Sequence, residues 1–68
     1  MTTNKQLLDE YIDRSGYRIN HICKQLGITP QSFGQKRRNV TRFKAAEIHT
    51  LCDLLHIKEE DKDTIFLP

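Results

Sequence analysis

Residues 19–33 read INHICKQLGITPQSF, and this stretch decides the fold. Ile19, Ile22, Cys23 and Leu26 recur at helical spacing before Gly27, and a helix start signal follows it, which predicts two short helices separated by a three-residue turn. Gly27 can adopt the positive φ angle that ends the first of these helices. Thr29 can cap the second helix, and Pro30 suits its first turn because the N–H that proline lacks would be unpaired there anyway.

The corner between the two helices requires particular residue types. A steep crossing needs a small side chain where the helices approach each other, a glycine in the turn and apolar side chains that hold the corner together. Cys23 supplies the small side chain and Gly27 the turn. The apolar residues expected to hold the corner are Ile22, Leu26, Ile28 and Phe33.

The rest of the chain continues the helical pattern. Apolar spacing predicts a first helix over about residues 4–15. The helix that Thr29 caps is expected to be the third and to extend over about residues 29–38. A fourth helix is indicated by the apolar stripe Ala45, Ile48, Leu51, Cys52 and Leu55. Residues 39–41 read as a loop, and residues 57–67 as a short helix and a tail that returns Ile65, Phe66 and Leu67 to the core. No segment alternates with period two, so we predict an all-α fold: a compact bundle of about five short helices in a single domain over residues 1–68.

Charge is distributed unevenly along the chain. Residues 14–46 contain eight basic residues and no acidic residue, whereas the remainder contains three lysines and all nine acidic residues. The eight basic residues are Arg14, Arg18, Lys24, Lys36, Arg37, Arg38, Arg42 and Lys44. The chain therefore divides into a segment of charge +8 and flanks of charge −6, although its net charge is only +2. Such a basic segment suits a polyanionic partner, and the alternative is a solvated basic face that binds nothing.

The run LGITPQSF at residues 26–33 resembles the LGIS-x-Q-x-F run of the Cro/repressor-type (lambda-repressor-like) helix-turn-helix family. Residues 43–57 are similar to the fourth helix of that family, so the resemblance extends over about residues 7–66. It implies a helix-turn-helix motif over about residues 18–38, whose second helix, residues 29–38, enters the major groove of double-stranded DNA. It also implies a small phage regulator of the choice between lysis and lysogeny, acting in the cytoplasm of a bacterial host.

Eight polar residues are the candidates for contact with DNA. On the second helix of the motif, glutamine side chains can pair with adenine edges, and lysine or arginine side chains with guanine edges. Basic side chains that flank this helix can bind phosphates. The candidates are Gln31, Ser32, Gln35, Lys36 and Arg38 on the helix, and Arg18, Arg42 and Lys44 beside it.

Four features depart from the family pattern. Ile19 stands at the start of the second helix, where the family often has a glutamine that binds phosphate and steadies the recognition helix. Lys36 and Arg37 stand where one position usually holds an apolar residue, so we expect a poorly anchored last turn, with aliphatic stems covering the core in its place. Gly34 lies within the same helix and lowers its helix propensity by about 1 kcal/mol relative to alanine. Lys44 stands where threonine is common, so the capping box with Glu47 is expected to be lost.

A second hypothesis is that the same scaffold binds a partner repressor protein and acts as an anti-repressor. Its acidic flanks would complement the basic DNA-reading face of such a partner. The sequence indicates no extra strand or coiled coil for dimerisation, so a homodimer is possible but not evident. A monomer would present a single recognition helix, which contacts only one half-site. The acidic residues concerned are Asp9, Glu10 and Asp13 in one flank and Glu59, Glu60, Asp61 and Asp63 in the other.

Other functional classes find little support in the sequence. The three histidines are dispersed, and neither a metal-ligand spacing such as Cys-x-x-Cys nor a glycine-rich phosphate loop occurs. His49 and Asp53 are four residues apart on one helix, a spacing typical of a surface contact. We therefore expect no enzymatic activity, no metal site and no cofactor. Neither a bilayer-spanning apolar run of about 20 residues nor a signal peptide is recognisable, so we expect a cytoplasmic protein that does not contact membranes.

Overall fold

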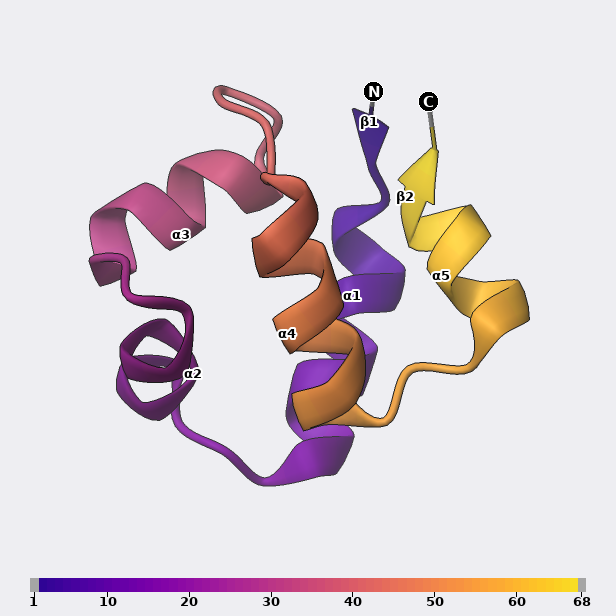
Figure 1. The fold of residues 1–68 in the computed structure, drawn as a ribbon, viewed down its shortest axis with the longest axis horizontal. Coiled ribbons are helices and arrows are strands. Elements are labelled where there is room, and N and C mark those ends of the chain that lie inside the picture. The colour runs from indigo at the N-terminus through magenta and orange to yellow at the C-terminus, as the bar shows by residue number, and fades with distance from the viewer. Residues whose placement is uncertain (1, 68) are drawn as a thin grey trace.

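The computed structural model describes the backbone of residues 2–67 and the side chains of residues 3–66. Within this part of the chain, five helices surround a shared core (Figure 1). The helices are α1 (Lys5–Ser15), α2 (Ile19–Leu26), α3 (Pro30–Arg37), α4 (Ala45–Leu55) and α5 (Glu59–Ile65). None of these described helices combines the length and the apolar content that crossing a membrane requires. The predicted all-α class and compact helical bundle are confirmed.

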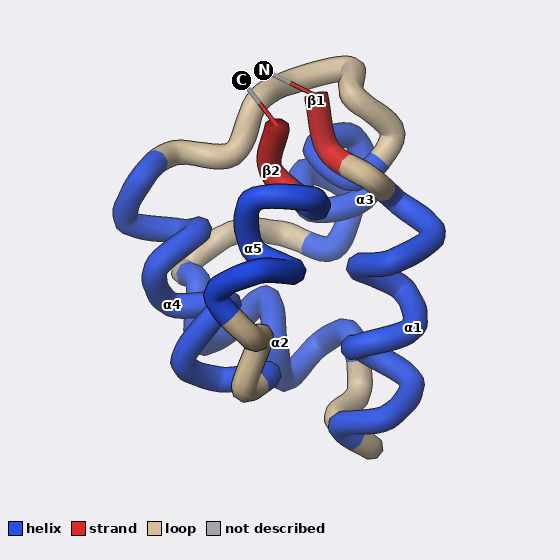
Figure 2. The backbone as a smooth tube through the Cα atoms, turned by 90° about the vertical axis from the view of Figure 1, so that its right-hand side faces the viewer, coloured by secondary structure: helices blue, strands red, loops and turns tan. Residues whose placement is uncertain are grey.

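The two ends of the chain lie side by side, which the sequence did not predict. Strand β1 (Thr2–Thr3) pairs antiparallel with strand β2 (Phe66–Leu67), as Figure 2 shows. The amide of Asn4 extends this pairing by donating to the carbonyl of Ile65 over 2.7 Å. Strands of two residues have no measurable alternation of apolar and polar side chains, so a test for period two could not find them.

The turn between α2 and α3 forms from the residues that were expected to form it. Gly27 ends α2 with a φ of 72°, in the left-handed region that favours glycine. The hydroxyl oxygen of Thr29 accepts from the amide of Ser32 over 3.1 Å, and Pro30 is the first residue of α3. The prediction of two short helices separated by a three-residue turn is therefore confirmed.

One cluster of buried apolar side chains draws on all five described helices. Phe43, which precedes α4, packs edge to face against Phe33 of α3 with ring centroids 6.0 Å apart. It packs in the same way against Phe66, at 5.6 Å. Among the described side chains, Phe33 is the only apolar one that α3 contributes to this core. Apolar packing therefore holds α3 at one point only.

The residues expected to hold the corner lie in this core, with Ile22, Cys23 and Phe33 buried and Leu26 and Ile28 half-buried against them. Ile65 and Phe66 are buried, as predicted for the returning tail, whereas the expectation for Leu67 lies outside the described side chains. In the predicted apolar stripe of α4, Cys52 is half-buried. Ala45, the first residue of the helix, is exposed. The apolar stripe of α4 thus faces the core along most of its length.

Candidate nucleic-acid interface

Helices α2 and α3 form a corner in which α3 crosses steeply relative to α2 (Figure 1). The amide of Gly27 donates to the carbonyls of Cys23 and Lys24 at the end of α2. The amide of Ile28 also donates to the carbonyl of Cys23, over 3.1 Å. These bonds satisfy carbonyls that would otherwise be unpaired at the helix end, and they fix the direction in which the chain enters α3.

The solvent-facing side of α3 carries amides, a hydroxyl and a guanidinium. Gln31 and Arg38 are exposed, and Ser32 and Gln35 are half-buried. The guanidinium of Arg38 lies back along the helix over Gly34, and a Cβ built on Gly34 would be 3.4 Å from its Nη1 atom. That distance is an ordinary van der Waals contact, so the cost in helix propensity indicated by the sequence remains the main effect of Gly34.

The side chain of Lys36 does not lie on this solvent-facing side. The prediction that Lys36 points outward and contacts DNA was therefore wrong about its direction. Its side chain is 9 % exposed, and its Nζ atom lies 2.6 Å from Oε1 of Glu47, whose side chain is equally buried. Lys36 takes a position on the inner side of α3 where its aliphatic stem packs inward. Its ammonium group then needs a buried partner, which the first turn of α4 supplies.

Glu47 receives two donors at the start of α4. Besides the ammonium of Lys36, its Oε1 atom accepts from the backbone amide of Lys44 over 2.8 Å. Half of the capping box therefore persists, contrary to the expectation that it would be lost, because that half needs only a backbone N–H at the capping position. Burial alone would raise the pKa of Glu47, but the hydrogen bonds from Lys36 and Lys44 outweigh it and hold the pKa below its usual range.

Arg37 ties α3 to α1. Its Nη1 atom lies 2.8 Å from Oδ1 of Asp9, and its Cζ atom lies 4.9 Å from the centroid of the Phe33 ring. Burial acts to raise the pKa of Asp9, but the hydrogen bonds from Lys5 and Arg37 outweigh it, so the pKa is lowered. The expected poor anchoring of the last turn of α3 is therefore wrong: two ion pairs, one to α1 and one to α4, hold it in place.

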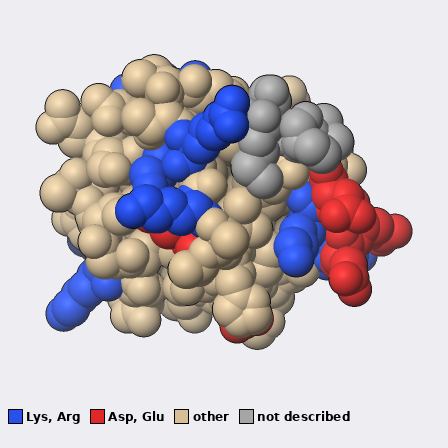
Figure 3. Space-filling view, turned by 45° about the horizontal axis from the view of Figure 1, so that its top comes forward, with Lys and Arg blue, Asp and Glu red and all other residues tan. Residues whose placement is uncertain are grey.

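The acid-free segment is consequently less basic in the folded chain than in the sequence. Two of its eight basic residues, Lys36 and Arg37, form ion pairs with carboxylates that lie outside the segment. The six that remain exposed are Arg14, Arg18, Lys24, Arg38, Arg42 and Lys44. Figure 3 shows basic side chains gathered near the middle of one face and acidic side chains gathered at an edge of it.

The three flanking candidates occupy different surroundings. Arg42 and Lys44 are exposed in the segment that connects α3 to α4, so they follow directly on the polar side of α3. Arg18, at the start of α2, shares a shallow hollow with Asp9 and Asp13. Those carboxylates lower the local positive potential, so Arg18 is a weaker candidate for binding phosphate than Arg42 or Lys44.

Asn39 is a residue of this region that sequence analysis missed. It follows α3 with a φ of 66°, in the left-handed region that asparagine tolerates better than most residues. Its Oδ1 atom accepts from the amide of Thr3 over 2.7 Å, and its Nδ2 atom donates to the carbonyl of Thr3 over 3.1 Å. The side chain thus pairs with β1 as a neighbouring strand would, and it fastens the end of α3 to the N-terminal segment.

Other polar clusters are small. Within the described residues, no group of three or more His, Cys, Asp or Glu side chains could hold a metal ion. His49 Nε2 lies 3.4 Å from Asp53 Oδ2, and the two side chains are 79 % and 74 % exposed, which makes this pair the expected surface contact. Comparison of the chain with protein-family models, curated proteins and solved structures finds no match.

Proposed function

We propose that this chain is a small transcriptional regulator that binds double-stranded DNA through a helix-turn-helix made of α2 and α3. The observation that best supports this is the division of α3 into two sides. One side presents Gln31, Gln35 and Arg38 without a carboxylate, and the other is tied to the protein body through Lys36 and Arg37. Readout of the major groove requires such a rigid helix with a polar outer side. By resemblance to Cro/repressor-type proteins, the chain would control phage genes in the cytoplasm of a bacterial host.

Each exposed side chain has a chemical role in this proposal. The amides of Gln31 and Gln35 can each pair with the edge of an adenine, and Arg38 can pair with a guanine edge. Arg42 and Lys44 would bind phosphates and so add affinity that does not depend on sequence. The proposed contacts are Arg18, Gln31, Ser32, Gln35, Arg38, Arg42 and Lys44.

Fluorescence anisotropy with a labelled mixed-sequence duplex, measured over a range of salt concentrations, tests the proposal. Affinity should fall steeply with salt, because each phosphate contact releases counterions and adds about −0.9 to the slope of log K against log salt. Arg42→Gln and Lys44→Gln should each make this slope shallower by about 1. Lys62→Gln removes an exposed lysine of α5 and should leave the slope unchanged. A duplex left unbound at low salt, or one slope for all variants, would contradict the proposal.

A second candidate function is binding of a partner repressor protein, with the chain acting as an anti-repressor. The observation that favours it is the acidic first turn of α5, where Glu59 and Glu60 are exposed. Such a turn complements a basic DNA-reading face. In that case the chain should release a repressor from its operator in a gel-shift assay. Glu59→Gln with Glu60→Gln should weaken the release, Arg42→Gln should not, and the absence of any release at excess chain would contradict this function.

A further inference from the structure

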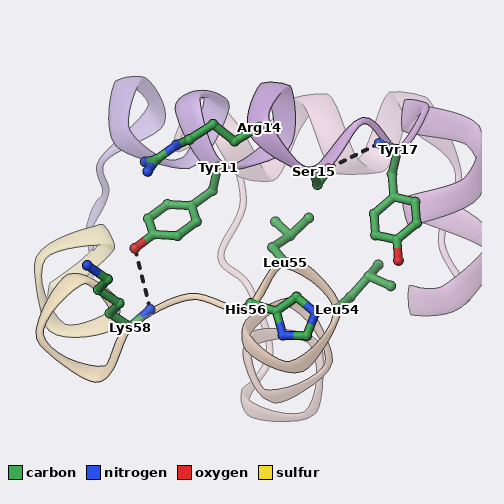
Figure 4. A pocket seen from close by; sticks show the side chains of 8 residues that line it. All are labelled: Tyr11, Arg14, Ser15, Tyr17, Leu54, Leu55, His56 and Lys58. Carbon is green, nitrogen blue, oxygen red and sulfur yellow. Dashed lines mark hydrogen bonds between the residues drawn. The ribbon is translucent and has the colours of Figure 1, made fainter.

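A hollow of about 440 Å³ lies where the C-terminal ends of α1 and α4 meet the segment that leads to α5 (Figure 4). Its floor is apolar, formed by Leu54 and Leu55 of α4. Its volume falls within the range of about 300–1,000 Å³ that is typical of small-molecule sites. None of the residues that line it belongs to the proposed DNA contacts, so the hollow requires its own interpretation.

One end of the hollow is cationic. Figure 4 shows the guanidinium of Arg14 and the ammonium of Lys58 on either side of Tyr11. The Cζ atom of Arg14 lies 4.6 Å from the centroid of the Tyr11 ring. The Tyr11 hydroxyl donates to the carboxylate of Asp61 and accepts from the backbone amide of Lys58 over 3.4 Å, so its own hydrogen-bonding capacity is used. Neither Arg14 nor Lys58 forms an ion pair with another described residue. The Nε atom of Arg14 donates to the carbonyl of Glu10 over 3.5 Å, which leaves the Nη atoms of Arg14 and the ammonium of Lys58 available to a ligand.

The opposite end of the hollow is aromatic. In Figure 4 the ring of Tyr17 lies beyond the two leucines, away from Arg14 and Lys58, and the imidazole of His56 lies beside the leucines, between Lys58 and Leu54. Tyr17 is 41 % exposed, and among the described residues Val40 is the only other exposed large hydrophobic one. It is held in place by stacking on His21, with ring centroids 4.9 Å apart, and by the bond from its amide to the hydroxyl of Ser15. These two contacts place the ring of Tyr17 at this end of the hollow.

We infer that this hollow binds a small organic carboxylate with an apolar or aromatic body. The carboxylate would meet Arg14 and Lys58, since hydrogen bonds between ionised groups are stronger than those between neutral ones. The body would lie on Leu54 and Leu55 and reach Tyr17, where burial of apolar surface contributes about 25 cal/mol per Å². The two cations outnumber the neighbouring carboxylate of Asp61, so this end disfavours an amine of the same shape. The polarity of the hollow thus sets the orientation of the ligand.

Amide chemical shifts in two-dimensional NMR of the full chain, titrated with indole-3-acetate, test this inference. We expect saturable shifts confined to Arg14, Tyr17, Leu54, His56 and Lys58. Tryptamine carries the same ring with the opposite charge, and acetate carries the charge without the ring. Both should produce much weaker shifts at the same amides.

Matched variants identify the groups that bind. Arg14→Gln and Lys58→Gln should each lower the affinity of the chain for indole-3-acetate by about two- to fivefold, as expected for exposed charge pairs. Lys24→Gln removes an exposed cation of α2 outside the hollow and should have no effect. Equal shifts with tryptamine, shifts that spread over the whole chain, or equal weakening by Lys24→Gln would overturn the inference. The titration contains no DNA, so its outcome is independent of the proposed DNA binding.

Discussion

Lys36 Nζ and Glu47 Oε1 lie 2.6 Å apart between α3 and α4, with both side chains only 9 % exposed. Helix α3 has a single apolar anchor among the described side chains, Phe33, so this ion pair carries much of its attachment. Loss of one member leaves the other charge buried and unpaired, at a cost of about 3–5 kcal/mol. The pair therefore fixes the orientation of the helix that we propose reads DNA.

Lys36→Met should lower the free energy of unfolding by about 3 kcal/mol, because the carboxylate of Glu47 loses its buried partner. Glu47→Gln should be similarly costly, since it leaves the ammonium of Lys36 unpaired. The double variant removes both charges, and its amide can still accept from the backbone of Lys44. It should therefore cost about 2 kcal/mol less than the sum of the single variants. Urea denaturation measures all three, and additive costs would show that the pair contributes no coupling.

Stability should fall in acid because of two carboxylates. The pKa values of Glu47 and Asp9 lie below their ordinary values of 4.5 and 3.8 in the folded chain. The folded chain then binds fewer protons than the unfolded chain as pH drops through these ordinary values. The free energy of unfolding should thus be constant above about pH 5.5 and should decline below about pH 5, toward the folded-state pKa values.

A pair of variants separates this effect from general acid sensitivity. In Glu47→Gln, the decline between about pH 5 and pH 3 should be smaller, because the lowered pKa is gone. Asp53→Asn removes an exposed carboxylate whose partner is the exposed His49, and it should leave the decline as it is. Chemical denaturation at a series of pH values measures both. A decline that is identical in the original chain and Glu47→Gln would contradict the assignment.

The features that were predictable from the sequence are those whose determinants are close together in the chain. Gly27, Thr29 and Pro30 act within a few residues, and the turn that they form was predicted at the right place. The partners of Lys36 and Arg37 were not, because these side chains bond to carboxylates 11 and 28 residues away. Since α3 has no apolar stripe besides Phe33, its spacing pattern also could not show which polar side chain points inward.

Asn39 shows the same separation between local and distant determinants. Its loop position was predicted, but its amide pairs with Thr3, 36 residues earlier in the chain. The hollow beside Tyr17 is likewise assembled from segments that are distant in sequence. The exposure of the candidates Gln31, Arg42 and Lys44, in contrast, could be predicted from helix and loop positions, which local patterns supply.

Asn39→Ala should lower the free energy of unfolding by about 1–3 kcal/mol. It removes both hydrogen bonds to Thr3. It also places alanine at a positive φ, a backbone conformation that is energetically less favourable for alanine than for asparagine or glycine. Asn39→Gly removes the same bonds but suits the backbone, so it should cost less. Hydrogen exchange at the amide of Thr3 should accelerate in both variants. Equal stability of the two variants would show that the left-handed backbone carries no penalty here.

Gly34→Ala should make the chain more stable and leave its DNA binding unchanged. Alanine in a helix interior is favoured over glycine by about 0.5–1 kcal/mol. The three nearest atoms to the added Cβ all belong to the guanidinium of Arg38, the closest at 3.4 Å, which is an ordinary van der Waals contact. The thermal midpoint should therefore rise, while Arg38 keeps its place on α3 and duplex affinity stays the same.

Arg38→Gln provides the matched control for this prediction. It should reduce duplex affinity without raising stability, since it removes the guanidinium and leaves Gly34 in the helix. Adding Gly34→Ala to Arg38→Gln should raise stability by about the same amount as in the original chain and leave affinity at the level of Arg38→Gln. Thermal unfolding and anisotropy with the same duplex measure the two quantities. Weaker binding by Gly34→Ala in the original chain but not in Arg38→Gln would contradict the prediction, because it would show that the added methyl group displaces the guanidinium.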